Sequence, residues 1–594
     1  MRFNLSLKFF LCSPLVILLF VNSFSQSFYS GLLESNIDKS FFKNRRIQNS
    51  IGRQPLNLFQ INENFQISFE RQHLIELMVE EENLNFYCDS CNSISDLRFV
   101  TGSRRSNGLK LNHEQKLGGF GSFLLDFSSK SSIGFFQRDK QRDIFFKPVL
   151  VFKSVNNKYN FSLAYESYKF LRELYGGLSS DSLFLNSRNL SANLNPINLK
   201  SSESVLKSKV VSLRNSYSLF ERKLDSMVQP MFKLKKVFAK SELDYSINKY
   251  GFYSQDKDFF EDYFLDTVQT KDTLALKSLT HLLGFGVDVG SDSTSLIVMP
   301  YFLNGHYEYI NLDKKSEYQT YSTGLEVSYS NKRKELYGSL RFQNDYVEEF
   351  DKDQKKISGG VAKSLTRKYW ICAEANFSQN YSPLLMSKYY SNNFIWNNSF
   401  SNENKVVFRA GISNLSKKDV LSLDYTVIKN YIFFNSSAIP EQDNSAFSIM
   451  SVHLSREIVV DRFTFIPKVK FTTVNKTEKY HYPEFVFNPE VNYARDLFKE
   501  KLNFSTGIRF FYFSAFYADS YMPTTDQYYF QSEIKSGNYP MFDFFIKFKI
   551  KRAELFFELN HFNEGLSGKD YFLTPHYPMT GRNLFFGINW KLVN

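Results

Sequence analysis

MFDFFIKFKIKRAELFFELN, residues 541–560, is the stretch of the sequence that indicates its fold. From 542 to 550 every second residue is apolar, and most of the residues between them are charged. A period of two is typical of a β-strand whose two faces meet different environments. The alternation resumes at 553–560 after Lys551-Arg552 alone, so the stretch is predicted to form two antiparallel strands joined by a tight turn.

The same alternation recurs over hundreds of residues, for example at 159–166, 325–329, 406–413 and 463–471. A soluble β-sandwich also alternates, but its core buries charge only at a large cost. Here the polar faces carry Lys, Arg and Glu at regular spacing, and many strands reach the roughly ten residues that a tilted strand needs to cross a membrane. The sequence therefore predicts an all-β fold, a transmembrane antiparallel β-barrel with a wet lumen.

The composition agrees with a barrel and excludes other classes. A mean hydropathy of −0.34 does not fit a bundle of membrane helices. With 64 Phe, 36 Tyr and 3 Trp the chain is too aromatic to be disordered, and 4 Cys are too few for a disulfide scaffold. Aromatic runs at strand ends, such as Phe510–Phe513, are predicted to form the interfacial girdles of the barrel.

The N-terminus has the pattern of an export signal. Arg2 and Lys8 precede an apolar run at 9–21, and Ser23-Phe24-Ser25 is a small-x-small cleavage site. We therefore expect residues 1–25 to be a cleaved signal peptide, 26–96 an N-terminal segment that lines the lumen, lies in the periplasm or forms the first strands, and 97–594 the outer-membrane barrel.

The barrel is predicted to be wide. At about 20 to 28 residues for a strand and its connections, residues 97–594 give roughly 18 to 24 strands, with about 22 the best value. Barrels of about 22 strands are normally filled. The candidate fillers are 26–96 and the long interruptions near 171–204 and 251–277. A TonB-dependent receptor is disfavoured, because 26–96 is shorter than the plug domain of such a receptor.

The last strand predicts the direction of its neighbours. Every second residue from Leu584 to Leu592 is apolar, and such a closing strand usually ends in the periplasm. The stretch 563–582 is then an external loop and Lys551-Arg552 a periplasmic turn.

The C-terminal pattern resembles a known family. It comprises Asp570-Tyr571-Phe572, Pro575-His576-Tyr577-Pro578-Met579, Gly581-Arg582-Asn583 and Phe586-Gly587-Ile588-Asn589-Trp590. Upstream, Ile51-Gly52, Pro55-Leu56, Val100–Ser103, Ser132–Phe136 and Gly176-Gly177 follow in the same order. These motifs are similar to those of the Putative porin family of Bacteroidetes outer membranes. The resemblance implies a single-chain outer-membrane β-barrel that passes solutes.

Motifs for chemistry are sparse. Cys88 and Cys91 form a CxxC pair without the setting of a redox or zinc site, and we expect a local disulfide. The eight His show no metal-binding spacing, and the acidic run 256–266 lacks the glycine and terminal Glu of a calcium loop. The formal charge of +12 is spread along the strands, with no nucleic-acid motif. We expect no enzyme activity, no cofactor, no metal and no nucleic-acid partner.

The polar faces supply candidate lumen-lining residues, seven basic and four acidic: Arg341, Arg409, Lys468, Lys470, Arg509, Lys547, Lys549, Glu326, Glu374, Glu554 and Glu558. Because lumen charge tunes selectivity, this excess predicts a mild preference for anionic or neutral polar solutes.

Two functions fit the predicted barrel. The first is a porin-like channel for small polar solutes in the outer membrane of a Gram-negative bacterium. The alternative is a non-conducting scaffold for surface assembly, secretion or motility partners. The expected partners are outer-membrane lipid and lipopolysaccharide, and the barrel-assembly machinery through the C-terminal strand.

Overall fold

The computed structural model describes residues 92–594 except 157, 187–191, 222–232, 292, 351, 367, 415–419 and 478. The predicted signal peptide, the Cys88–Cys91 pair and almost all of the segment 26–96 lie outside these residues. The described part is almost entirely β-strand, and its first strand begins at Ser93, slightly before the predicted start of the barrel at 97.

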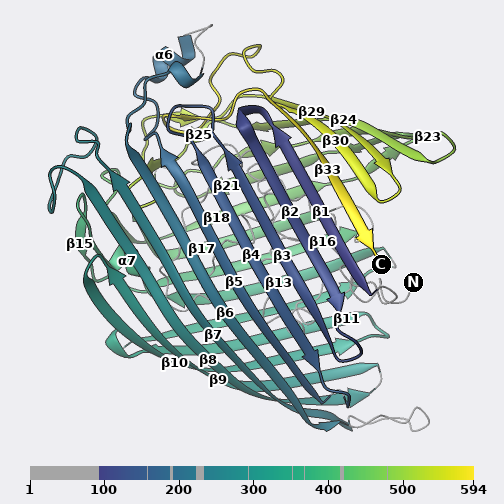
Figure 1. Cartoon of the computed structure of the whole chain (residues 1–594). Helices are drawn as coiled ribbons and strands as arrows, with labels where there is room; N and C mark the ends of the chain where they lie inside the picture. The colour runs from purple at the N-terminus through teal and green to yellow at the C-terminus, as the bar shows by residue number, and fades with distance from the viewer. Residues whose placement is uncertain are drawn as a thin grey trace.

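One large antiparallel sheet forms the wall of the molecule (Figure 1). Its 25 segments are β1 (Ser93–Gly102), β2 (Ser106–Lys116), β3 (Gly121–Ser132), β4 (Gln141–Lys153), β5 (Tyr159–Leu174), β6 (Ser202–Glu221), β7 (Lys233–Ser254), β8 (Thr270–Ser291), β9 (Thr294–Asn311), β10 (Lys314–Asn331), β11 (Leu336–Val347), β12 (Lys352–Ser364), β13 (Tyr369–Asn380), β16 (Glu403–Asn414), β17 (Val420–Phe434), β18 (Pro440–Ser455), β19 (Ile458–Val460), β20 (Phe463–Ile466), β21 (Lys468–Val474), β22 (Phe485–Phe487), β23 (Glu490–Leu497), β24 (Leu502–Phe513), β29 (Met541–Ile550), β30 (Ala553–Asn560) and β33 (Asn583–Val593).

The sheet closes on itself. Each strand pairs with the next along the chain, and β1 pairs with β33 in the register Leu97↔Trp590. Three strands consist of two segments each, β18 with β19, β20 with β21, and β22 with β23, so the wall is a closed barrel of 22 strands. Pro467 and Pro489 interrupt two of these strands, because proline has no N–H to donate to the ladder. The predicted fold class and strand number are confirmed.

The connections at the two ends of the barrel differ. At the end where β1 begins and β33 ends, most of the connections are short, and Lys551-Arg552 joins β29 to β30 as predicted. At the other end long loops span 175–201, 255–269, 381–402, 514–540 and 561–582. These long loops contain the short elements α6 (Asp181–Asn186), η2 (Ala192–Leu194), α7 (Leu384–Ser387), β14 (Lys388–Tyr390), β15 (Ile395–Asn397), β25 (Phe516–Tyr517), β26 (Ser520–Met522), β27 (Gln527–Tyr529), β28 (Lys535–Ser536), β31 (Phe572–Thr574) and β32 (Tyr577–Pro578); η1 (Ser103–Arg105) and η3 (Glu348–Phe350) lie at shorter connections.

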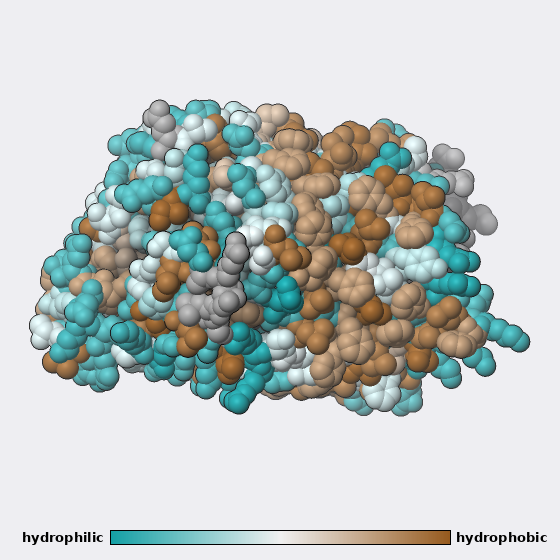
Figure 2. Space-filling view, turned by 90° about the horizontal axis from the view of Figure 1, so that it is seen from above, coloured by the Kyte–Doolittle hydropathy of each residue, from teal (hydrophilic) through white to brown (hydrophobic). Residues whose placement is uncertain are grey.

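The outer face of the wall is apolar. On β33 the side chains of Leu584, Phe586 and Trp590 are 50%, 48% and 46% exposed, and the same alternation marks Leu555 and Phe557 on β30. Figure 2 shows hydrophobic residues gathered in a broad area between two hydrophilic ends. Within the described residues no helix is long and apolar enough to cross a membrane.

Several inward aromatic rings lie over a glycine of the neighbouring strand. A Cβ built on Gly324 would stand 2.0 Å from the Tyr301 ring, and one on Gly587 would stand 2.5 Å from the Phe556 ring. Tyr301 and Gly324 are direct partners in the ladder, as are Phe556 and Gly587. Each glycine therefore makes room for a ring to lie flat against the wall, an arrangement that fixes strand register.

We expect Gly324→Val to destabilise the barrel by about 1–3 kcal/mol, because the new side chain displaces the Tyr301 ring and its neighbours. Gly338→Val is the matched control, since a Cβ at Gly338 meets nothing nearer than the Gly360 carbonyl oxygen at 3.7 Å. Urea unfolding in detergent micelles measures both. Equal stability of the two variants contradicts the packing role of Gly324.

Candidate functional site: the lumen and its outer mouth

The eleven charged residues predicted from the sequence share one face of the wall. Arg341 lies between Leu340 and Phe342, which are 50% and 40% exposed on the apolar face, so its side chain is on the other face. The ladder pairs residues of this face with one another, as in Glu326↔Arg341 and Glu374↔Arg409. The others follow the same alternation: Lys468, Lys470, Arg509, Lys547, Lys549, Glu554 and Glu558.

Several of these residues are paired with opposite charges. Arg341 Nε lies 3.3 Å from Glu326 Oε1, and Arg509 Nη2 lies 2.9 Å from Glu558 Oε1. Arg409 Nε lies 3.5 Å from Asp424 Oδ1. In the ladder, Lys549 is the partner of Glu554, Lys470 of His453 and Lys468 of Ser455. Lys547 Nζ lies 5.5 Å from the centre of the Phe545 ring. Glu374 accepts a hydrogen bond from Asn376.

Sequence reasoning missed a second set of charges on the same face. Lys240 Nζ lies 2.6 Å from Glu242 Oε1, and Arg214 Nη2 lies 3.6 Å from Asp244 Oδ1. A further pair joins Lys356 to Asp345 at 3.1 Å. The alternation within β7 was the signal that could have found its charges. Each of these three pairs adds one base and one acid, so seven bases over four acids become ten over seven and the relative excess of positive charge falls.

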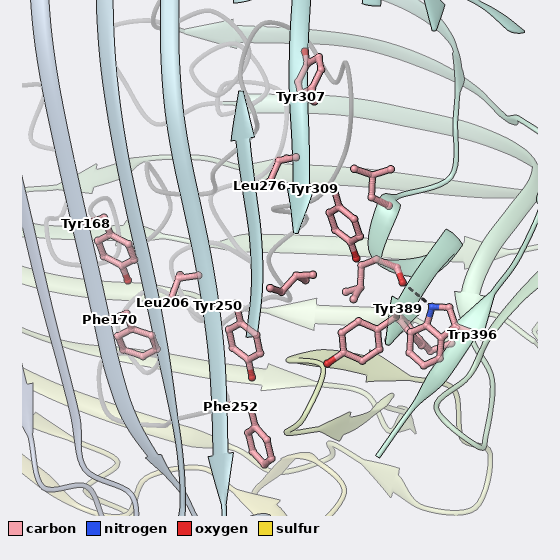
Figure 3. Packing of buried hydrophobic residues seen from close by; sticks show 14 of the residues in the cluster. Tyr168, Phe170, Leu206, Tyr250, Phe252, Leu276, Tyr307, Tyr309, Tyr389 and Trp396 are labelled. Carbon is pink, nitrogen blue, oxygen red and sulfur yellow. Dashed lines mark hydrogen bonds between the residues drawn. The ribbon is translucent and has the colours of Figure 1, made fainter. Parts of the chain in front are cut away.

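A first aromatic cluster fills one side of the mouth on the long-loop side (Figure 3). Tyr250, Leu276 and Tyr309 come from the wall, whereas Tyr389 and Trp396 come from the β14–β15 hairpin of the 381–402 loop. Trp396 Nε1 donates to the Leu385 carbonyl at 2.7 Å, and the Tyr309 hydroxyl donates to the Lys388 carbonyl at 2.7 Å. The loop is thus folded inward and anchored to strands β7 to β9.

A second aromatic cluster fills the other side. It joins Phe511 and Phe513 of β24 to Tyr175, Phe184 and Tyr577 of the loops. Tyr175 packs on Tyr577 with ring centres 5.1 Å apart, and Phe184 of α6 packs on Tyr571 at 5.5 Å. The loops 175–201, 514–540 and 561–582 therefore pack together over this side of the barrel.

A buried contact joins the two sides, and we call it the mouth latch. Arg172 of β5 donates hydrogen bonds to the Asp526 carboxylate and the Tyr521 hydroxyl oxygen, and Tyr521 donates to Asp526 at 2.6 Å. The side chains of Arg172 and Asp526 are 1% and 7% exposed. The Tyr250 hydroxyl donates to the Pro523 carbonyl at 2.9 Å. Because β7 lies nearly opposite β24 and β29 in the ring, the 514–540 loop crosses the lumen.

The sequence located only part of this mouth. Residues of both predicted filler loops are in the clusters, among them Tyr175 and Phe260, but the loops 381–402 and 514–540 were not predicted to fill it. The predicted interfacial girdle is wrong for Phe511 and Phe513, whose rings are buried inward. Phe510 fits the outward position, since it packs on Phe542 at 4.9 Å.

The acidic run forms part of this loop structure. Asp256 accepts hydrogen bonds from the backbone N–H groups of Lys200 and Ser201, at 3.0 Å each. These hydrogen bonds outweigh the desolvation of the carboxyl by burial and hold the pKa of Asp256 below its usual range. Among the described residues no group of His, Cys, Asp and Glu side chains is arranged to hold a metal ion. Asp256 therefore connects the loops 175–201 and 255–269.

His576 gives the loop assembly a pH dependence. Its Nδ1 lies 2.9 Å from Asp181 Oδ2 on α6, and this hydrogen bond raises the pKa of His576 above its ordinary value of 6.5. A raised pKa means that the contact is fully present below pH 6.5 and is lost as the pH rises through the higher folded value.

The loss of this contact should be visible at the Leu178 amide, which donates to the His576 carbonyl. After correction for the intrinsic effect of pH on exchange, we expect the hydrogen-exchange rate of this amide to increase as the pH rises above 6.5. A His576→Gln variant that keeps the same pH dependence contradicts this assignment.

The barrel, its apolar outer face and its inward loops define a large antiparallel β-barrel of the outer-membrane type. Residues 36–594 match the model of the Putative porin family, and the chain belongs to this family. No curated protein sequence matches the chain.

Solved structures share the fold. A mutant of the ferric enterobactin receptor PfeA of Pseudomonas aeruginosa, in complex with enterobactin, is similar with a TM-score of 0.58 and 10% identity, over 85% of this chain and 82% of that chain. The ferric preacinetobactin receptor BauA of Acinetobacter baumannii gives 0.56 and 9%, over 85% and 80%. The FrpB iron transporter of Neisseria meningitidis gives 0.56 and 12%, over 85% and 81%.

Proposed function

We propose that the chain is an outer-membrane porin of a Gram-negative bacterium, of the Bacteroidetes group that the C-terminal motifs resemble, and that it passes small polar solutes. The observation that carries the proposal is the inward face of the wall, where ion pairs such as Arg341–Glu326 and Arg509–Glu558 recur on widely separated strands. Charged groups are stable in such numbers when water or close partners surround them. The eleven predicted residues would line this aqueous path.

The aromatic clusters and the mouth latch supply the gate of the proposed channel. Their buried rings leave little room for water on the long-loop side, and hydrophobic constrictions close pores by excluding water. Solute passage then requires the 514–540 loop to leave the lumen. The enterobactin bound to PfeA is not carried over to this chain, because 10% identity supports the fold alone.

Liposome swelling with sugars of graded size tests the proposal. We expect slow swelling with the smallest sugars in the intact protein, and a size limit that rises when the mouth is opened. The control is the heat-modifiable migration of the barrel on gels, which shows that each preparation is folded. Impermeability to the smallest sugar, even in a variant without the crossing loop, contradicts solute passage.

We expect only weak ion selectivity. Many bases of the inward face are paired with acids, as in Arg214 with Asp244 and Lys356 with Asp345, so much of their field cancels. The reversal potential of an opened variant in a planar bilayer under a salt gradient measures this. A strong preference for either anions or cations contradicts the balance of charges.

A non-conducting scaffold is the second candidate function, and the filled mouth is the observation that favours it. In either case the proposed surroundings are outer-membrane lipid and lipopolysaccharide, and the proposed assembly signal is the apolar face of β33. The proposal involves no enzyme activity and no cofactor.

A further inference from the structure

Three lysines are direct partners in the ladder of the neighbouring strands β5, β6 and β7 (Figure 1). Lys169 pairs with Lys207, and Lys207 pairs in turn with Lys249. Directly opposed side chains of an antiparallel pair have Cβ atoms about 5 Å apart, and like charges placed in this way repel one another. Lys209, two residues from Lys207 on β6, adds a fourth positive charge to the same face. We call these four residues the lysine patch.

The side chains of the lysine patch point away from the lumen. Lys207 is exposed, whereas its chain neighbours Leu206 and Ser208 are fully buried on the inward face. Lys169 and Lys249 are exposed in the same way, each between two buried residues of the inward face. The lysine patch therefore lies on the face that meets the surroundings of the barrel.

The lysine patch lies just beyond the apolar part of the outer face, on the side of the long loops. Val211, Tyr245 and Leu279 are ladder partners on this face and are 39%, 43% and 45% exposed. Lys249 follows Tyr245 by four residues toward the long loops, which is about 13 Å along the strand and less across a tilted wall. Exposed aromatic residues at the edge of the apolar band mark the membrane interface of a barrel. In the outer membrane, the ammonium groups therefore lie at the level of the lipid headgroups.

The chain does not neutralise this patch as it neutralises the lysines beside it. On β8 and β10, Lys277 and Lys315 lie 2.8 Å and 3.5 Å from the Glu308 carboxylate. No carboxylate of the described residues forms an ion pair with a lysine of the patch. On β5 and β6 the nearest outward acids toward the loops, Glu173 and Glu203, are four residues away from Lys169 and Lys207. An anion bound from outside would therefore relieve the repulsion within the patch.

We propose that the lysine patch binds a phosphate group of a phosphorylated lipid of the outer leaflet, the lipid part of lipopolysaccharide. The ammonium groups of Lys169, Lys207 and Lys249 surround the phosphate, and the acyl chains lie against the apolar side chains around Tyr245. Lysine binds phosphate as a point charge, and its attraction to anionic lipid adds up over neighbouring residues. The inference rests on the proposed outer-membrane location of the chain, but not on solute passage.

Urea unfolding of the folded protein in an uncharged detergent, with and without lipid A, tests the proposal. A ligand that binds the folded barrel stabilises it, so we expect lipid A to raise the urea midpoint. Lipid A from which the phosphates have been removed should raise it much less. Inorganic phosphate at the same concentration should leave it unchanged, because it makes no contact with the apolar side chains. Equal stabilisation by the two lipids, or by inorganic phosphate, overturns the proposal.

The triple variant Lys169→Gln/Lys207→Gln/Lys249→Gln should need at least about tenfold more lipid A for half of the shift in the urea midpoint, since three charges near the phosphate are lost. Glutamine keeps most of the side-chain length and removes the repulsion between ladder partners, so we expect the variant to fold without lipid. Full lipid A binding by the folded triple variant overturns the proposal.

The matched control carries the same change in charge at the other end of the barrel. It replaces by glutamine three exposed lysines of the short turns, Lys158, Lys332 and Lys368. We expect this control to bind lipid A as the unmodified protein does, and an equal loss of binding in both variants overturns the proposal. Because the titration measures no flux, its result is separate from that of the swelling assay.

Discussion

Replacement of residues 516–535 by Asn-Gly is expected to raise the swelling rate of liposomes that contain the protein by about tenfold or more, since it removes the segment that crosses the lumen. The ends of the loop are already adjacent. The Asn538 N–H donates to the Phe513 carbonyl at 2.8 Å, and the Ala515 N–H donates to Asn538 Oδ1 at 3.1 Å. A short turn can therefore close the gap without strain in β24 or β29.

The removed segment carries Tyr521, Pro523 and Asp526, which make the contacts with β5 and β7. Without them the buried contacts of the 514–540 loop with β5 and β7 are lost. A control replacement of Ser437 and Ala438 in the tight 435–439 turn, with Asn-Gly, alters an external turn and leaves the crossing loop intact. Swelling that is equally slow in both variants, with both folded, supports the scaffold function instead.

Arg172→Met is expected to destabilise the protein by about 3–5 kcal/mol, because it leaves the buried Asp526 carboxylate without the cation that binds it. The double variant Arg172→Met/Asp526→Leu should recover most of this loss, since apolar side chains of similar volume replace a buried ion pair at little cost. Unfolding in urea, followed by heat-modifiable migration and by tyrosine and tryptophan fluorescence, measures the difference.

Arg138→Met is the matched control. Arg138 pairs with Glu173 at 3.4 Å on the same rim, but the two side chains are 31% and 29% exposed. We expect a loss of no more than about 1 kcal/mol there, because water screens such a pair. Equal losses for the two variants would show that the latch contributes no more than an ordinary surface contact.

The sequence predicted the wall of the molecule well. In β29 and β30 one face contacts lipid and the other faces the lumen, so the alternation of apolar and polar residues indicates on which face each side chain lies. The tight turn at Lys551-Arg552 sets the register in which the two strands pair. The charged residues of the inward face follow from the same alternation. Their partners were harder to predict, because the ion pair of Arg409 with Asp424 depends on the register of two strands.

The mouth could not be predicted in the same way. Phe511 and Phe513 follow the period of two, but nothing in that period tells an aromatic ring at the membrane surface from one buried under a loop. The latch joins Arg172 to Asp526 through contacts that no local pattern encodes. Loop residues obey no fixed spacing, so their inward folding becomes visible only in three dimensions.

The pairing of β1 with β33 sets the order of assembly. These strands belong to opposite ends of the polypeptide, and bringing them together while the chain between them is disordered carries a large entropic cost. We therefore expect neighbouring hairpins to form first and the pairing of β1 with β33 to form last. Until these two strands pair, the N–H and C=O groups along both edges of the sheet are without hydrogen-bond partners and can pair with strands of other copies, which leads to aggregation. Deletion of β33, from Asn583 onward, would leave the sheet with two permanently exposed edges and is expected to cause aggregation.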